Sequence, residues 1–269
     1  MMTGSRPIGF FDSGVGGLSI WREVTQRLPH QPTVYLADNA YCPYGSRSSE
    51  QIQARALAIT RFLLDEHDCR LIVVACNTAS AAALTMLRER FSVPFAGIEP
   101  AIKPAAQATR TGHVGVLATL GTFQGSLFQN TSRRYAHGVH LHLQIGHGLV
   151  EQVESGQLHD PVTGQLLRQY LEPMLAAGVD QIVLGCTHYP FLLPLMRQLV
   201  DGQVHIIDPA PAVARQVESL LAAQTTQLPA PLDWSLPAHK FYTTGPARTF
   251  TLEGQLPLIS FEHIDLELT

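Results

Sequence analysis

Short apolar runs alternate with longer stretches of helical periodicity along most of the chain. The expected strands are residues 7–11, 33–37, 71–75, 93–98, 113–118, 139–144, 181–184 and 204–207. Segments between them, such as 48–67, 78–90, 162–177 and 190–200, carry apolar residues at helical spacing. Because parallel strands need long crossover connections, usually helices, this alternation predicts an α/β fold with parallel sheets.

The expected strands form two sets that repeat along the chain. Ile8 aligns with Val114 at a step of 106 residues, Val34 with Val139 at 105, and Cys76 with Cys186 at 110. We therefore expect two pseudo-symmetric parallel-sheet α/β domains of about a hundred residues each.

Clusters of proline and small residues at 99–112 and 208–212 mark the seams between these domains. The first domain is expected to comprise residues 1–98 and 209–269 and to carry Cys76. The second is expected to comprise residues 99–208 and to carry Cys186. After the second seam, a helix at 211–223 and a strand at 240–244 are expected to return to the first domain.

Composition and charge add only the exclusion of some partners and locations. The formal charge of -4 gives no basic surface for a phosphate backbone, so nucleic acid is not an expected partner. No apolar run approaches the roughly 20 residues that span a membrane. The N-terminal stretch lacks the charged and apolar regions of a secretory signal, so a cytoplasmic protein is expected.

Two cysteines stand where expected strands end and helices begin. Cys76 follows the strand at 71–75 and Cys186 follows the strand at 181–184. Ligands of open α/β sheets bind beyond the carboxyl ends of the strands. Two facing domains would therefore place one thiol on each wall of a cleft. Of the other cysteines, Cys69 is expected to be a small buried hydrophobe.

One thiol on each wall suits the removal of a proton from one face of a carbon and its return on the other. A thiol pKa of about 8.5 can be lowered into the working range by a helix N-terminus or a charged neighbour. Further polar groups are expected at the same edge: Asp12 and Ser13, the turn Cys42–Gly45, Asn77 and Thr78, and Thr187 and His188. Asn77, Thr78 and Thr187 stand where helix N-caps belong, so capping alone also explains them.

Three cofactor interpretations are weaker. The loop SGVGG with Asp38 partly matches a dinucleotide motif, but Ser19 replaces the last small residue and Asp12 would repel a pyrophosphate. His140 and His142 share a strand face, yet no Cys or carboxylate is near them in sequence, which favours an edge strand over a metal site. Neither of the two lysines lies in a strand-end motif, which argues against pyridoxal phosphate. No metal and no cofactor are expected.

Eight motifs in order resemble the glutamate racemases of the aspartate/glutamate racemase family: FDSGVGGL, YCPYG, ACNTASA, GIEP, GVLATLGT, VESG, LGCTHYP and DPA. They cover nearly the whole chain. The resemblance implies an enzyme that needs no cofactor, with two pseudo-symmetric α/β domains and the active site in the cleft between them. It implies interconversion of L- and D-glutamate, which supplies D-glutamate for peptidoglycan.

Residue roles are implied motif by motif. Cys76 would take the proton from D-glutamate and Cys186 from L-glutamate. The implied substrate-binding residues are Asp12, Ser13, Tyr44, Gly45, Asn77, Thr78, Thr187 and His188, and Asp12 and His188 would also assist the thiols. Thr119, Thr122 and Glu154 match the family motifs as well.

The chain departs from the resemblance at one point. Family members often carry a Cys-Pro pair shortly before the VExG glutamate, whereas this chain has IGHGLVEQVESG, so the resemblance does not define that loop. Two alternatives remain open. Aspartate racemases share the two-thiol plan but usually have Glu where this chain has His188, and a non-catalytic binder of acidic amino acids would retain the fold. The resemblance allows a homodimer without requiring one.

Overall fold

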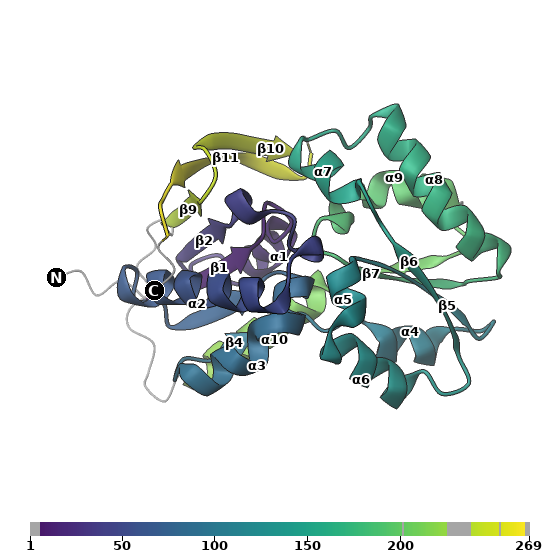
Figure 1. Ribbon diagram of the computed structural model, residues 1–269, viewed down its shortest axis with the longest axis horizontal. Helices are drawn as coiled ribbons and strands as arrows, with labels where there is room; N and C mark the ends of the chain where they lie inside the picture. Colours follow the sequence, from purple (N-terminus) through teal and green to yellow (C-terminus); the bar gives the residue numbers. More distant parts are fainter. Residues whose placement is uncertain (1–5, 201, 225–237, 253, 267–269) are drawn as a thin grey trace.

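The computed structural model describes residues 6–200, 202–224, 238–252 and 254–266, and the other residues of the expected domains lie outside it. The described chain forms two α/β units that lie side by side, each around its own sheet (Figure 1). The strands of the first half are β1 Ile8–Asp12, β2 Thr33–Ala37, β3 Leu71–Val74 and β4 Phe95–Ala96. Those of the second are β5 His113–Ala118, β6 His140–Ile145, β7 Gln181–Gly185 and β8 His205–Ile207.

The two sets of strands have the same order. The first sheet contains β2-β1-β3-β4 and the second contains β6-β5-β7-β8, all with parallel pairing. The pseudo-symmetry and the steps of 106 and 110 residues agree with this register. The alignment of Val34 with Val139 is wrong. Val34 pairs with Gly9 and His142 with Gly115, so His142 is the equivalent of Val34.

The chain after the second seam adds strands to the first sheet. β9 His239–Thr243 pairs with β2, and β10 Arg248–Leu252 and β11 Leu256–His263 complete a seven-stranded sheet in the order β10-β11-β9-β2-β1-β3-β4. β10 and β11 are antiparallel, so this sheet is mixed and not purely parallel. The chain between Leu252 and Leu256 is too short for a parallel crossover, which takes a dozen or more residues.

Helices cover both faces of the first sheet because its strands are apolar on both sides. α1 Leu18–Arg27 and α10 Ala210–Gln224 pack together on one face, in a core that contains Phe10 and Tyr35. α2 Ser49–Asp65 and α3 Asn77–Arg90 pack on the other, in a core that contains Phe11 and Leu36. Successive strand residues thus enter opposite cores, as the two-residue period of a strand requires.

The second sheet is covered in the same way. α4 Ile102–Ala108 and α6 Ser126–Tyr135 lie on one face, and α8 Pro161–Ala176 and α9 Leu193–Val200 on the other (Figure 1). The short elements at the junction of the units are α5 Leu120–Gln124, α7 Leu149–Glu154 and the 3-10 helices η1 Asn39–Tyr41, η2 Tyr44–Ser46 and η3 Tyr189–Leu192. One core includes both Tyr35 and Tyr189, so it joins the two units.

Most boundary differences fall within two residues of the expected ones. The expected strand at 93–98 shortens to β4, and the helix expected at 190–200 divides into η3 and α9. No helix among the described residues is both long enough and apolar enough to cross a lipid bilayer.

Candidate active site

A small cavity lies where the carboxyl ends of β3 and β7 face each other. Its lining residues come from both units: Ser13, Pro43, Tyr44, Gly45, Cys76, Asn77, Thr78, Thr119, Val150, Cys186, Thr187 and His188. Every site residue expected from the sequence is in this lining except Asp12, which is fully buried at the end of β1.

Cys76 occupies the N-cap of α3. Its Sγ accepts a hydrogen bond from the backbone N–H of Ala79 at 3.4 Å, and Asn77 and Thr78 form the first turn. The expectation that Asn77 and Thr78 cap this helix is therefore wrong, because the thiol takes the cap position one residue earlier. Burial raises the pKa of the Cys76 thiol, and the nearby Asp12 carboxylate raises it further.

The buried amide of Asn77 lacks hydrogen-bond partners. The residue is 3% exposed, and neither its Oδ1 nor its Nδ2 has a hydrogen-bond partner within the described part of the chain. A buried polar group without a partner costs about 1–3 kcal/mol. Because Asn77 lines the cavity, a polar molecule in that cavity is the natural partner for its amide.

Asp12 connects the two units behind the cavity. Its Oδ2 accepts a hydrogen bond from the Thr187 hydroxyl at 2.7 Å, across 175 residues of sequence. Its Oδ1 accepts one from the backbone N–H of Gly14 at 2.7 Å and one from the Ser13 hydroxyl at 3.1 Å. Burial raises the pKa of Asp12, although these bonds oppose the shift.

Cys186, His188 and Glu154 form a relay on the second wall. The Sγ of Cys186 lies 3.7 Å from Nδ1 of His188, and Nε2 of His188 lies 2.7 Å from Oε1 of Glu154. Burial alone would lower the pKa of His188, but hydrogen bonds to the neighbouring thiols and to Glu154 raise it well above its usual value. With Nε2–H directed at Glu154, Nδ1 is free to exchange a proton with the thiol.

Glu154 is the last residue of α7 and is held by several donors. Oε1 also accepts from the backbone N–H of Val15 at 2.7 Å, and Oε2 accepts from Nη2 of Arg248 at 2.7 Å and Nδ2 of Asn39 at 3.0 Å. Burial opposes ionisation, yet the bonds to His188 and Arg248 lower its pKa to about 2. The IGHG segment begins α7 with Gly148 in the left-handed region, at a φ of 81°.

The glycines of SGVGG permit close contact between the units. A Cβ on Gly14 would lie 1.8 Å from Oε1 of Glu154, and one on Gly16 would lie 2.3 Å from Nδ1 of His188. Real Cβ contacts are not that short, so any other residue would push the two walls apart. The loop that partly matches a dinucleotide motif therefore packs against the relay.

The buried ion pair of Asp38 and Arg55 fixes Tyr44 beside the cavity. The Tyr44 hydroxyl donates to Asp38 Oδ2, and Arg55 binds both Asp38 oxygens, with Nε at 2.9 Å from Oδ2 and Nη2 at 2.7 Å from Oδ1. Because the hydroxyl is used by Asp38, Tyr44 presents its ring and backbone to the cavity. Gly45 beside it packs closely against Thr119.

A chain of threonines joins the first wall to the second sheet. The hydroxyl oxygens of Thr78 and Thr119 lie 2.9 Å apart, and those of Thr119 and Thr122 lie 3.0 Å apart. The Thr122 hydroxyl donates to the carbonyl of Gly185 at 3.1 Å, directly before Cys186. The family motif ATLGT thus connects the two sides of the cavity through hydrogen bonds, and its residue Thr119 lines the cavity.

The histidines at 137–148 lie away from this cavity. β6 is an edge strand, and His142 Nε2 lies 2.9 Å from Nδ1 of His113, whose ring stacks on His140. The interpretation as a packed edge strand agrees with this arrangement.

Sequence reasoning missed Asn39 and Arg248, and it did not indicate that Glu154 and Cys42 lie beside His188. Asn39 and Arg248 are more than 90 residues from Glu154 in sequence, and no motif linked them to it. The only available signal was the glycine pair of SGVGG, which implies a close approach by some other segment.

Comparisons with known proteins agree with this geometry. The profile of the Asp/Glu/hydantoin racemase family matches residues 19–217. The chain belongs to this family. It is 52% identical to the glutamate racemase of Roseiflexus sp. over 81% of its length and 80% of that protein. It is 44% identical to that of Ectopseudomonas mendocina over 97% of both chains.

Solved structures of racemases share the whole fold. Glutamate racemase isoform RacE1 from Bacillus anthracis matches with a TM-score of 0.81 and 30% identity, over 99% of this chain and 100% of that one. Escherichia coli glutamate racemase in complex with L-glutamate matches with a TM-score of 0.78 and 35% identity, over 89% and 90%. The two-unit α/β architecture is therefore the racemase fold.

Proposed function

We propose that the protein is a glutamate racemase that interconverts L- and D-glutamate and supplies D-glutamate for peptidoglycan. The observation that carries the proposal is the pair of thiols, Cys76 and Cys186, at equivalent strand ends on the lining of one small cavity. The relatives named above are glutamate racemases at 44–52% identity, which favours glutamate over aspartate and catalysis over mere binding.

In this mechanism each thiol serves one face of Cα. With L-glutamate bound, Cys186 as thiolate takes the α-proton, and Cys76 as thiol delivers its own proton to the opposite face. Burial raises the pKa of Cys76, which favours its protonated form as the acid in this direction and opposes its thiolate form as the base in the reverse one. The reverse reaction exchanges the two roles. Side chains supply both acid and base, so the proposal includes no cofactor.

Substrate is held by the polar groups of the lining. Asn77 offers an amide without a partner in the described part of the chain, and Thr78 offers a hydroxyl group. The Ser13 and Thr187 hydroxyls donate to Asp12, so their oxygens are left to accept from the substrate ammonium group. The N-terminal turn of α3 and the turn at Tyr44 and Gly45 offer backbone N–H groups to carboxylates. Asp12 acts through Thr187 and Cys76, since it does not line the cavity.

The organisation of the chain is part of the proposal. We assign residues 1–98 and 209–269 to one domain and residues 99–208 to the other, which is supported by the origin of the strands in the two sheets. A cytoplasmic location is supported by the four free thiols, which need a reducing compartment. A homodimer remains a prediction of the resemblance, to be checked by sedimentation.

Purified protein given L-glutamate without added cofactor should lose the circular dichroism of the substrate until both enantiomers are equal. L-Aspartate should react much more slowly, because a side chain shorter by one carbon misplaces a carboxylate and leaves buried polar groups unpaired. Equal turnover of the two amino acids would contradict the choice of substrate. Binding of glutamate without turnover would instead indicate a binding protein.

His188→Asn should slow proton removal from L-glutamate more than from D-glutamate. His188 lies beside Cys186 and not beside Cys76, and acid–base assistance is worth about 10²–10⁴ in rate. Initial rates at saturating L- and D-glutamate, measured separately by circular dichroism, give the two kcat values, because kcat/KM must change equally in both directions when the equilibrium constant is one. Unchanged rates in both directions would reduce His188 to a structural role.

A further inference from the structure

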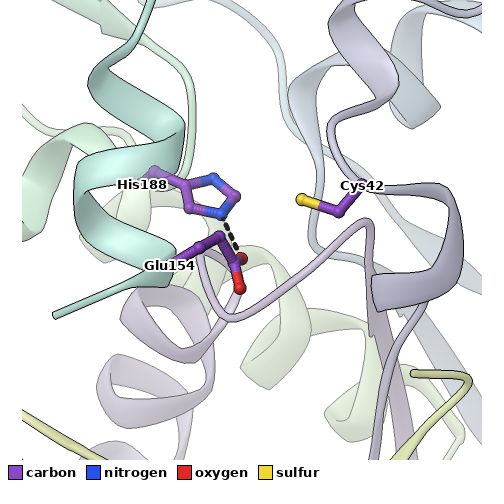
Figure 2. A group of neighbouring side chains, drawn as sticks. All are labelled: Cys42, Glu154 and His188. Atoms are coloured by element: carbon purple, nitrogen blue, oxygen red, sulfur yellow. Dashed lines mark hydrogen bonds and ion pairs between the residues drawn. The ribbon is translucent and has the colours of Figure 1, made fainter. Parts of the chain in front are cut away.

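Three side chains with different ligand atoms converge at the outer side of the relay. Cys42 Sγ, a carboxylate oxygen of Glu154 and an imidazole nitrogen of His188 all lie within 4.8 Å of one another. Figure 2 shows the sulfur of Cys42 directed at the imidazole ring, from the side opposite the helix that carries Glu154. Cys42 is partly buried and is not among the residues that line the substrate cavity.

We propose that Cys42, Glu154 and His188 form a binding site for Zn²⁺ that inhibits the enzyme. A thiolate, an imidazole and a carboxylate are the three ligand types that zinc accepts, whereas Mg²⁺ and Ca²⁺ prefer oxygen atoms alone. Three protein ligands leave the fourth tetrahedral position for water.

The three ligand atoms lie close enough together to bind this ion after small shifts. Zinc–ligand bonds of about 2.0–2.3 Å place neighbouring ligand atoms of a tetrahedron about 3.3–3.7 Å apart. The ion would replace the proton between Nε2 of His188 and Oε1 of Glu154, so that pair would widen from 2.7 Å by about half an ångström. When the metal binds, the Cys42 thiol releases its proton to solvent. The neutral imidazole of His188 changes tautomer, its proton moving from Nε2 to Nδ1, so that the Nε2 lone pair binds the ion.

The surroundings of Glu154 are built to hold a ligand. Its carboxylate keeps the bonds from Val15 N–H, Arg248 and Asn39 whether or not Nε2 is engaged, and such outer partners orient metal ligands. Gly14 leaves the space open, because a Cβ there would lie 1.8 Å from Oε1 and 3.2 Å from the Cys42 sulfur.

Inhibition follows from the position of His188, and this consequence rests on the proposed function. An imidazole bound to zinc through Nε2 cannot pass a proton to Glu154 and keeps a fixed ring, so its exchange with Cys186 is blocked. The ion would lie beside the cavity and not within it. Glutamate should therefore protect poorly against zinc.

Cobalt binding tests the site without reference to catalysis. Full-length reduced protein, freed of metal with a chelator, should bind one Co²⁺ with a thiolate-to-cobalt absorption in the near ultraviolet, and Zn²⁺ should displace it. Cys42→Ser should abolish this absorption and weaken zinc binding about tenfold or more, since the thiolate is the strongest ligand. Cys69→Ala removes a buried thiol elsewhere and should leave binding unchanged.

Two further arms separate this site from poisoning of the catalytic thiols. The double variant Cys76→Ala/Cys186→Ala should keep the cobalt absorption. Zinc should inhibit the wild type over the same concentration range in which it displaces cobalt, whereas the activity that Cys42→Ser retains should resist zinc. A cobalt signal that survives in Cys42→Ser, or that disappears in the double variant, would overturn the zinc site. A Cys42-dependent signal in a protein that cannot racemise glutamate would overturn the proposed function alone.

Discussion

Cys76→Ser and Cys186→Ser are each expected to lower the rate of racemisation by about 10²–10⁴-fold in both directions. Both thiols line the cavity, one from the end of β3 and one from the end of β7. Each turnover needs one of them as a base and the other as an acid. A serine hydroxyl is far less acidic than a thiol, so the variant cannot supply either function at neutral pH.

Isotope transfer from deuterium oxide tests whether two bases take part. The thiol that protonates the intermediate has already exchanged with solvent, so product should carry deuterium at Cα from the first turnover. Unreacted substrate should remain protonated early in the reaction. Proton loss followed by NMR and inversion followed by polarimetry give the two rates separately.

A single base that serves both faces gives a different outcome. It would return some original proton to product, or exchange the substrate as fast as it inverts it. Cys69→Ser is the matched control, because Cys69 is buried in the core of the first sheet and does not line the cavity. Near-full activity in either Cys76→Ser or Cys186→Ser would end the two-base mechanism.

The cavity lining was predictable because it depends on local rules. Cys76 and Cys186 follow the ends of β3 and β7 within two residues, which places each at the carboxyl edge of its sheet whatever the rest of the chain does. The repeat of 110 residues between these thiols then indicates that both edges are equivalent. Residues that directly follow β1, β3 and β7, such as Ser13, Asn77 and Thr187, share this placement.

The relay's outer partners were not predictable, since they depend on how the two units pack together. Glu154 meets Arg248 of β10 and Asn39 of η1 only after the tail has joined the first sheet beside β2. Hydrophobic periodicity describes each element and not the contacts between distant ones. The approach of Cys42 to Glu154 and His188 lacked a signal for the same reason, because both residues are more than a hundred positions away.

The internal repeat of the sequence did not predict the antiparallel hairpin β10–β11 either. These strands have no equivalent in the second sheet, which ends at β8, so the internal symmetry could not indicate them. Their contribution is Arg248, which gives Glu154 a permanent cation partner. The feature that breaks the symmetry of the fold thus also distinguishes the surroundings of Cys186 from those of Cys76.

Asp38→Ala is expected to lower the free energy of unfolding by about 3–5 kcal/mol. The Asp38 side chain is 0% exposed and that of Arg55 is 4% exposed, and they form a two-point ion pair beneath the cavity. The Thr244 hydroxyl donates to the same carboxylate at 2.7 Å. Removal of the carboxylate would leave the Arg55 charge buried without its partner, which accounts for the size of the loss.

Urea unfolding of Asp38→Ala and Glu218→Ala provides the comparison. Glu218 pairs with Arg27 at 3.4 Å on the surface, with side chains 51% and 37% exposed, and such pairs are worth about 0–1 kcal/mol. Asp38→Ala should also raise the KM for glutamate, since Tyr44 loses the acceptor that fixes it against the cavity. Arg55→Met combined with Asp38→Ala should recover part of the stability, because the double variant buries no unpaired charge. If Asp38→Ala and Glu218→Ala lowered the free energy of unfolding equally, the prediction would be wrong. Water would then replace the Asp38 carboxylate around Arg55 without cost.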